Sequence, residues 1–203
     1  MSIKMEADVV VVAAGMSGLS AAVQAQELLN ERGGGKVIAF EKSGTTGGAA
    51  NMGMALFAVE SRLQKEDMYY WTKDEAFLDF MEYTHWRADA KLVRRWFNMS
   101  ADTIDWLMGM GTQFQGVYKY FKNSHKTQHI IKVPGTNKPT ERCASVNIKN
   151  MTDYGVELGV EDVYKRQAPA WPAPGPWPGR YPEAGSAACV PPKPCSYLLS
   201  PGD

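Results

Sequence analysis

The chain has 203 residues, which is the length of a single domain of ordinary size. Its 22 acidic residues balance its 22 basic residues, so the net charge is zero and the composition indicates no nucleic-acid partner. The three cysteines, Cys143, Cys189 and Cys195, form no metal-ligand pattern, and no metal site is predicted.

No stretch of the sequence is long and apolar enough to span a membrane. The uncharged run over residues 9–26 has the length of a signal-peptide core, but Glu6 and Asp8 interrupt the basic leader that a signal peptide needs. The glycine spacing described below accounts better for this run. We therefore expect a cytoplasmic protein, and the sequence indicates no particular protein partner.

Residues 7–41 have the order of parts of a βαβ unit. Four valines at positions 9–12 form an apolar, β-branched run that is typical of a strand buried on both faces of a parallel sheet. A helix is expected over residues 16–32, ended by the glycines at 33–35. A second apolar strand is expected over residues 37–40, closed by Glu41. The predicted fold class is therefore α/β, with a Rossmann-like nucleotide-binding unit.

The turn between the first strand and the helix carries the spacing of a dinucleotide-binding fingerprint. Gly15 and Gly18 let the backbone approach a pyrophosphate, which the N–H groups and the dipole at a helix N-terminus attract. No charged residue lies between Asp8 and Glu27, so no side chain competes with the phosphate. Glu41 follows Gly18 by 23 residues, near the ~20 expected of the acid that binds the ribose, and it favours FAD or NAD over NADP.

Ala13 stands where the fingerprint has its first glycine. That position forms the tight turn, and a methyl group there predicts a small backbone shift. The strand before the turn, the helix after it and the acid at the expected distance all favour a dinucleotide-binding unit over a chance glycine turn.

A second segment rich in glycine and small residues, 42–57, follows Glu41 directly. These residues are too small to form a core, so the backbone is expected to approach another segment or a flat ligand closely. The alternative is a flexible loop, but unstructured loops of this length are uncommon in compact domains.

The two motifs VVVVAAGMSGLSAA and FEKSGTTGGAANMG together resemble the FAD-binding flavoproteins of the fumarate reductase and succinate dehydrogenase group, above all their soluble, single-chain bacterial members. The resemblance covers residues 7–161. It implies that Gly15 and Gly18 bind the pyrophosphate, that Glu41 binds the ribose, and that residues 46–53 wrap the diphosphate and the isoalloxazine. The candidate cofactor-binding residues are Ala13, Ala14, Gly15, Ser17, Gly18, Glu41, Lys42, Thr46, Gly47, Gly48, Ala49, Ala50 and Gly53.

The same resemblance bears on how the flavin is held. Respiratory members attach FAD covalently through a histidine shortly before the double glycine. Here Ser, Gly, Thr and Thr occupy positions 43–46, and the first histidine of the chain is His85. The resemblance therefore implies FAD bound non-covalently.

Three helices are expected in the middle of the chain. Thr72 and Glu75 form a capping box for the first, and Asp89 caps the second. Ser100 is expected to begin the third, which stops at the glycines at 109 and 111. Their aromatic and methionine stripes are interpreted as packing.

The region after these helices is expected to be irregular over residues 114–139. Two histidines four residues apart could bind a metal, but the further ligands of a metal site are missing. We therefore expect a polar loop near the flavin edge, formed by Lys122, His125, Lys126 and His129. A last helix is expected over residues 145–158. Val160 then opens a strand that the following residues are not expected to complete.

The character of the sequence changes at residue 162. Residues 162–167, Asp-Val-Tyr-Lys-Arg-Gln, resemble the in-frame translation of a transposon-end adapter used in sequencing libraries. Residues 168–203 hold ten of the twelve prolines and show no helical or strand period, and a proline-rich linker or ligand is the biological alternative. We therefore expect a partial FAD-binding domain over residues 1–161 and an irregular, artefactual proline-rich tail over residues 162–203.

The predicted function is that of the N-terminal part of an FAD-binding oxidoreductase of the fumarate reductase type. The family transfers a hydride between flavin and an activated C=C bond of a small molecule such as fumarate, urocanate, a ketosteroid or another enoate. Its catalytic residues lie in later parts of family members, so none is named here and the chain alone is expected to be inactive. The alternatives are a non-catalytic nucleotide-binding module and a fragment of an NAD-dependent dehydrogenase, against which the second glycine-rich segment argues.

Overall fold

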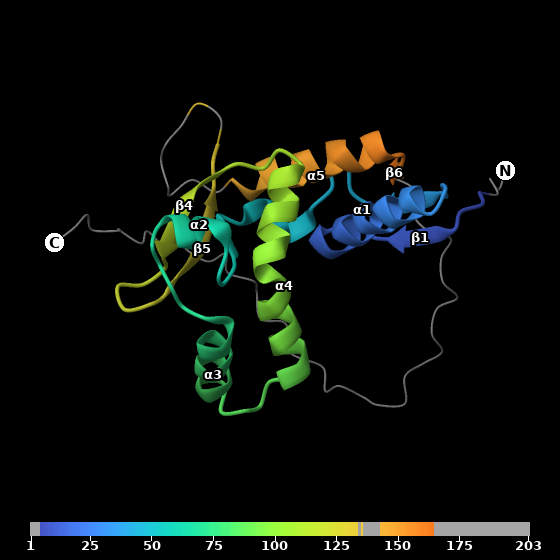
Figure 1. Ribbon diagram of the computed structural model, residues 1–203. Helices are drawn as coiled ribbons and strands as arrows, with labels where there is room; N and C mark the ends of the chain where they lie inside the picture. Colours follow the sequence, from blue (N-terminus) through green and yellow to red (C-terminus); the bar gives the residue numbers. More distant parts are fainter. Residues whose placement is uncertain (1–4, 134, 136–142, 165–203) are drawn as a thin grey trace, which may run out of the picture. The chain divides into compact units, whose positions relative to one another are not determined.

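The computed structural model describes residues 5–133, 135 and 143–164, which all lie in one compact unit (Figure 1). Its N-terminal part is the predicted βαβ unit, composed of β1 (Val9–Val12), α1 (Met16–Glu31) and β2 (Val37–Glu41). The two strands are parallel, with Val9 opposite Val37 and Val12 opposite Phe40. The prediction of an α/β, Rossmann-like unit is confirmed.

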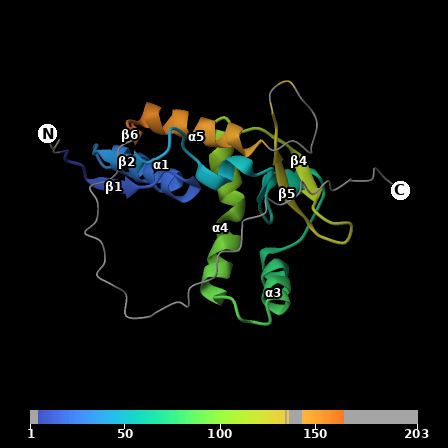
Figure 2. The ribbon, with the colours of Figure 1, turned by 180° about the vertical axis from the view of Figure 1, so that it is seen from behind.

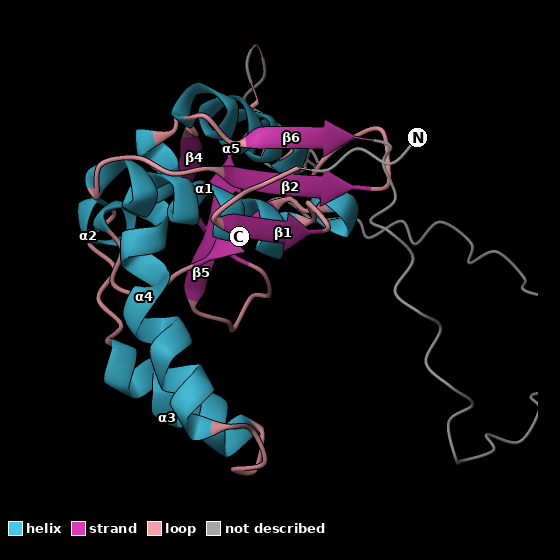
Figure 3. Cartoon of the chain, turned by 90° about the vertical axis from the view of Figure 1, so that its right-hand side faces the viewer, coloured by secondary structure: helices cyan, strands magenta, loops and turns pink. Residues whose placement is uncertain are grey.

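A third parallel strand, β6 (Glu161–Tyr164), pairs with the other edge of β2, so the strand order is β1-β2-β6 (Figure 3). The expectation that the strand after Val160 is not completed is therefore wrong. A free edge of a parallel sheet offers backbone donors and acceptors, which pair with an extended segment whatever its side chains. The strand also crosses the boundary expected after residue 161.

The expectation of burial on both faces is wrong for β1. Val9 and Val11 pack on the core beside α1, but Val10 is 56% exposed and Val12 is 68% exposed. Among the described residues β1 is an edge strand, with a strand neighbour on one side only, whereas Ile38, opposite Val10 in the central strand β2, is 1% exposed. A continuous run of valines thus specified the strand but not the number of buried faces.

A second sheet is antiparallel and has the order β3-β5-β4, formed by β3 (Ala55–Phe57), β4 (Phe114–Lys119) and β5 (Lys126–Ile131). The β4–β5 hairpin occupies the region that was expected to be irregular. Lys122 and His125 do lie in the exposed connection between its strands, but His129 is fully buried in β5. The polar side chain of His129 suggested a loop. In the structure the side chain is buried, and a hydrogen bond with the Ser61 hydroxyl satisfies its Nε2 atom.

The helix-capping signals at Thr72 and Asp89 are confirmed. Thr72 and Glu75 form the capping box of α3 (Lys73–Tyr83), and Asp89 accepts hydrogen bonds from the first N–H groups of α4 (Ala90–Gly109). A short helix that was not predicted, α2 (Arg62–Glu66), begins with a capping box of Ser61 and Gln64.

The prediction of a separate helix beginning at Ser100 is wrong, because α4 continues through this residue. The Ser100 hydroxyl donates to the carbonyl of Phe97, one turn earlier, and accepts the N–H of Val59. Ser100 is therefore a buried packing residue of one long helix. Serine is common at helix N-caps, which is why a helix start was predicted at this position.

The helix α5 (Ala144–Leu158) begins one residue before its predicted start and ends at Gly159, which has φ +105°. It lies beside α1 in both views of the ribbon (Figures 1 and 2). Leu19 and Val23 of α1, Leu107 of α4, and Ile148 and Met151 of α5 form the core between these helices. This core sets the position of α5 relative to the glycine turn that begins α1. Among the described residues, no helix is both long and apolar enough to cross a bilayer.

Candidate cofactor site

Gly18 lies in the first turn of α1, directly over the carbonyl oxygen of Ala13. A Cβ atom built on Gly18 would be 1.8 Å from that oxygen, so a side chain here would push the helix away from the end of β1. Gly15 is different, because nothing lies within 4 Å of a Cβ built on it. Gly18 therefore allows the close packing of strand and helix, and Gly15 leaves open space in front of the helix.

Ala13 forms the tight turn at a φ of +76°. This left-handed conformation is disfavoured for a residue with a Cβ by about 1–2 kcal/mol, which is why the fingerprint has glycine here. The departure from the fingerprint thus takes the form of backbone strain at a single exposed residue.

The N-terminus of α1 is free of competing side chains. Its N-cap, Gly15, has an extended conformation and offers no side-chain acceptor, and the first turn contains no acidic residue. Ser17 is exposed in this turn. Backbone N–H groups at such an end lack intrahelical acceptors, and together with the helix dipole they can bind a phosphate.

Glu41 lies at the end of β2 and reaches the turn before α1. Its Oε2 accepts the N–H of Ala14 at 2.8 Å, and its Oε1 accepts the N–H of Ser43 at 2.8 Å and the Ser43 hydroxyl at 3.1 Å. These bonds, the one from the Ser43 N–H foremost, lower the pKa of the Glu41 carboxyl against an opposing effect of burial. The site therefore holds a charged acceptor beside the open helix end, with the exposed Lys42 next to it.

The second glycine-rich segment returns to the same turn. The N–H of Gly47 donates to the carbonyl of Ala14 at 2.7 Å, and Gly47 forms a parallel bridge with Gly15. Gly47 and Gly48 have φ values of +90° and +53°. The 3₁₀ helix η1 (Gly48–Met52) follows, and it includes Ala49 and Ala50. The predicted close backbone approach to another segment is confirmed, whereas the approach to a flat ligand stays a prediction.

Two supports of this segment were not found in the sequence. The Asn51 amide donates to the carbonyls of Thr46 and Gly48, at 2.7 and 3.2 Å. An asparagine just after a glycine turn is a recognisable signal for such a bond. The other support is α5, where Ile148 packs under Gly47 and Thr152 bonds Thr46. The helix itself was predicted, but no local pattern identifies α5 as the support of this segment, because about a hundred residues separate the two.

The two histidines near the β4–β5 hairpin do not contact the candidate cofactor residues. His125 stacks on Trp71, with ring centroids 3.7 Å apart, and hydrogen-bonds the Tyr69 hydroxyl at 2.7 Å. His129 bonds Ser61 in the interior. No group of three His, Cys, Asp or Glu side chains that could hold a metal is found in the ranges that the structure describes.

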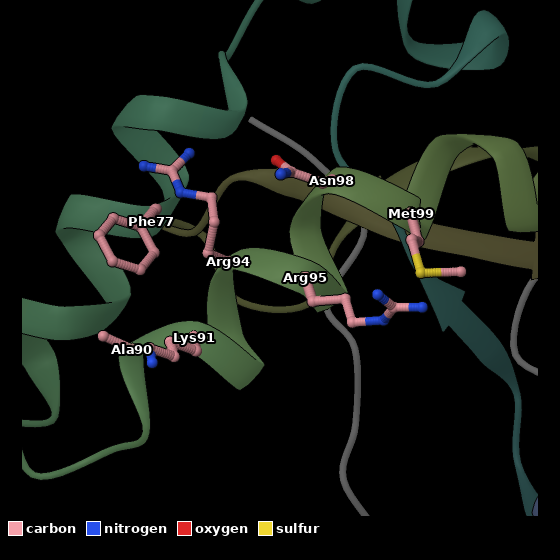
Figure 4. Close-up of a pocket in the computed structure, with 7 residues that line it drawn as sticks. All are labelled: Phe77, Ala90, Lys91, Arg94, Arg95, Asn98 and Met99. Carbon is pink, nitrogen blue, oxygen red and sulfur yellow. The ribbon is translucent and has the colours of Figure 1, made fainter.

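An open groove of about 540 Å³ lies on α3 and α4, and none of its lining residues belongs to the glycine-rich segments (Figure 4). Phe77 of α3 faces Arg94 of α4, whose guanidinium lies 4.1 Å from the ring centroid and pairs with Asp74 at 2.6 Å. The principal cation of the groove is thus already engaged, and we assign no ligand to it. The lining residues are Phe77, Ala90, Lys91, Arg94, Arg95, Asn98 and Met99.

These features define a dinucleotide-binding protein: a parallel βαβ unit, a helix N-terminus without a competing acidic or capping side chain, and a charged acceptor at the end of the second strand. Residues 8–168 match the model of the family described as FAD binding domain, and the chain belongs to this family. FAD is the cofactor of the family. The residues present fit it, because Gly15 leaves room before the helix and Glu41 offers an ionised acceptor.

Two curated relatives are oxidoreductases by name. A vinyl phenol reductase of Lactiplantibacillus plantarum is 34% identical over 128 residues, which are 63% of this chain and 25% of that protein. An NADH:fumarate oxidoreductase of Klebsiella pneumoniae is 28% identical over an alignment of 160 residues, which covers 74% of this chain and 16% of that protein. The chain thus spans a quarter or less of the length of these two relatives.

Solved structures show the same fold. A 3-ketosteroid-Δ4-(5α)-dehydrogenase from Rhodococcus jostii superposes with a TM-score of 0.64 at 19% identity, over 81% of this chain and 38% of that one. A flavocytochrome c3 fumarate reductase in an open conformation also superposes with a TM-score of 0.64, at 21% identity, over 78% of this chain and 26% of that one. The resemblance to fumarate reductase and succinate dehydrogenase flavoproteins is confirmed at the level of the fold and the family.

Proposed function

We propose that this chain is the N-terminal part of an FAD-dependent oxidoreductase that transfers a hydride between flavin and an activated C=C bond of an enoate-like or styrene-like small molecule. The observation that carries the proposal is the convergence on Ala14, whose N–H donates to Glu41 and whose carbonyl accepts from Gly47. These bonds bring the ribose acid and the second glycine-rich segment to the open end of α1.

The chain's own residues bind and orient, and the bound FAD supplies the hydride chemistry. The N-terminus of α1 would hold the diphosphate, and Glu41 would accept a ribose hydroxyl. Each oxygen of the Glu41 carboxylate already accepts one backbone N–H, from Ala14 or from Ser43, and keeps a further acceptor position that a ribose hydroxyl would use. Segment 46–53 would lie along the diphosphate and the isoalloxazine. No catalytic residue is assigned among residues 1–203.

The curated relatives support this class of substrate. Vinyl phenol and fumarate, after which they are named, each carry a conjugated C=C bond. The absence of a histidine at positions 43–46 supports non-covalent attachment of the flavin.

The test is a visible spectrum of the protein encoded by the complete gene recovered from source DNA. We expect flavin absorption bands that leave with the low-molecular-weight fraction after denaturation. We also expect oxidation of the reduced flavin by an enoate or a vinyl phenol. A protein without flavin bands would contradict the proposal and favour a simple nucleotide-binding module.

The same DNA tests the proposed boundary at residue 161. We propose that residues 162–203 derive from an adapter and an assembly error, supported by the adapter-like hexapeptide and the abrupt gain of proline. Amplification across codons 155–203 should then give a different downstream sequence. One uninterrupted read that encodes residues 155–203 as printed would overturn this part of the proposal.

A further inference from the structure

The glycine-rich segment 46–53 is attached to one face of α5 over two helical turns. Thr46 bonds Thr152 near one end, with 2.7 Å between their Oγ1 atoms. At the other end, the carbonyl of Gly53 accepts the N–H groups of Cys143 and Ala144, both at 3.1 Å. The positions 144, 148 and 152 are four residues apart, so they share a face of the helix.

The middle of the segment lies directly on this face. A Cβ atom built on Gly47 would be 2.6 Å from Cγ2 of Ile148 and 2.7 Å from the amide nitrogen of Asn51. The carbonyl of Thr46 and that of Gly48, on either side of Gly47, both accept from Asn51. The path of residues 46–48 is therefore set by α5 on one side and by Asn51 on the other.

The direction of the hydroxyl contact can be assigned. Thr152 donates its proton to the carbonyl of Ile148 at 2.8 Å, so its oxygen is left as an acceptor. The Thr46 hydroxyl is therefore the donor to Thr152. Because Thr46 is buried, the loss of this acceptor would leave its hydroxyl without the partner that it has here.

We propose that Thr152 is a positioning residue for FAD, which acts by fixing Thr46 and through it the segment that faces the α1 N-terminus. The inference rests on the proposed function, because it assigns to segment 46–53 the diphosphate and the isoalloxazine. Thr152 would act through its hydrogen bond with Thr46. Its role is to keep Gly47 in contact with Ala14, and so to keep Gly48 and Ala49 beside the cofactor.

The test compares Thr152→Val with Thr152→Ser in the protein encoded by the complete gene, with Thr103→Val as the matched control. Thr103 is a helical threonine that donates to the carbonyl four residues earlier, at 2.9 Å, just as Thr152 does, but it is exposed and has no second hydroxyl partner. Two quantities are measured: amide hydrogen exchange without FAD, and the dissociation constant for FAD by fluorescence titration.

Thr152→Val should speed the exchange of the segment's protected amides and raise the FAD dissociation constant, each by roughly 3- to 10-fold, as expected from the loss of one hydrogen bond. These amides belong to Gly47, Ala50 and Gly53. Thr152→Ser should restore both quantities, and Thr103→Val should change neither. Visible circular dichroism of bound FAD should change only in Thr152→Val.

Three results would count against the inference. Unchanged FAD binding by Thr152→Val would overturn it and leave the proposed function intact. Equal acceleration of the amides of α4 and of segment 46–53 would show a loss of stability throughout the fold, and would overturn a positioning role. Failure of the unmodified protein from the complete gene to bind FAD would overturn the proposed function, and the inference with it.

Discussion

The carboxylate of Glu41 accepts the N–H of Ala14 across 27 residues of sequence. This bond joins the end of β2 to the turn that precedes α1, so the acid and the anion-binding end of the helix are fixed relative to each other. Ser43 completes the arrangement through its backbone N–H, which donates to the other carboxylate oxygen at 2.8 Å. The acid is therefore preorganised and ionised before a ribose hydroxyl arrives.

Replacement of Glu41 by alanine should weaken FAD binding. A hydrogen bond to a charged group contributes about 1.5–3 kcal/mol, so the dissociation constant should rise by roughly 10- to 100-fold. The matched control is Glu31→Ala, which removes an exposed acid at the far end of α1 and should have no effect. Fluorescence titration of FAD measures both, and an unchanged constant for Glu41→Ala would remove this residue from the site.

Replacement of Ala13 by glycine should stabilise the fold and should leave FAD binding unchanged or tighter. Glycine removes the strain of φ +76°, about 1–2 kcal/mol, but it adds up to about 1 kcal/mol of backbone entropy to the unfolded chain. Ala21→Gly in the exposed interior of α1 is the control, and it should destabilise by about 1 kcal/mol. In urea denaturation, Ala13→Gly should raise the free energy of unfolding and Ala21→Gly should lower it. Looser FAD binding by Ala13→Gly would mean that the methyl group of Ala13 makes a favourable packing contact.

The two glycines of the double-glycine turn should differ in their tolerance of alanine. At Gly47, alanine would have a φ of +90° and a contact of 2.6 Å with Ile148. Strain and overpacking together should therefore lower the free energy of unfolding by roughly 2–4 kcal/mol. At Gly48, φ is +53° and the nearest atom to a Cβ is 3.8 Å away, so about 1–2 kcal/mol is expected. Equal losses for the two variants in urea denaturation would contradict this packing.

The local signals in the sequence predicted the local structure well. The glycine spacing, the capping box at Thr72 and the cap at Asp89 each act within one turn of chain, and the structure has the corresponding helix start at each of them. Such signals express backbone geometry, which does not depend on distant residues.

The errors arose where burial depended on distant partners. His129 was interpreted as part of a loop because its partner, Ser61, is 68 residues away. Ser100 was interpreted as a helix start, although its partner Val59 lies in another part of the fold. The dependence of segment 46–53 on Thr152 spans 106 residues and has no signature in either stretch. Periodicity and residue type indicate the kind of environment that a residue has, but not which segment supplies it.

The buried His129 should make stability depend on pH. Burial lowers the pKa of His129 below its ordinary value of 6.5 and outweighs the hydrogen bonds that act the other way. Its Nδ1–H donates to the carbonyl of Thr127, so Nε2 accepts from the Ser61 hydroxyl and the ring is neutral. The unfolded chain, by contrast, takes up a proton near pH 6.5.

The sign of the effect follows from these two pKa values. As the pH falls below about 6.5, the unfolded state gains a proton that the folded state does not, so the free energy of unfolding decreases until the folded-state pKa is passed. The contribution of one such group is at most about 1.4 kcal/mol per pH unit. His129→Gln retains an acceptor near the position of Nε2 and should flatten the profile between pH 7 and pH 5. Parallel profiles for the two proteins in urea denaturation would contradict the assignment.

The 203-residue chain by itself should self-associate and should lose FAD during size exclusion. Within the part of the chain that the structure describes, β1 pairs on one side only, with β2, and it exposes Val10 and Val12 on one face of the sheet. An apolar edge of this kind pairs with other chains, so association competes with the folded monomer. Each exposed valine also forgoes part of the ~25 cal/mol per Å² that burial of apolar surface provides.

The double variant Val10→Thr, Val12→Thr keeps β-branched side chains and should shift the elution toward the monomer. Val156→Thr, on the exposed side of α5 at 56% exposure, is the matched control and should not. A sharp monomer peak of the unmodified chain that carries one FAD per chain would show that β1 needs no cover and that the site is complete within these residues.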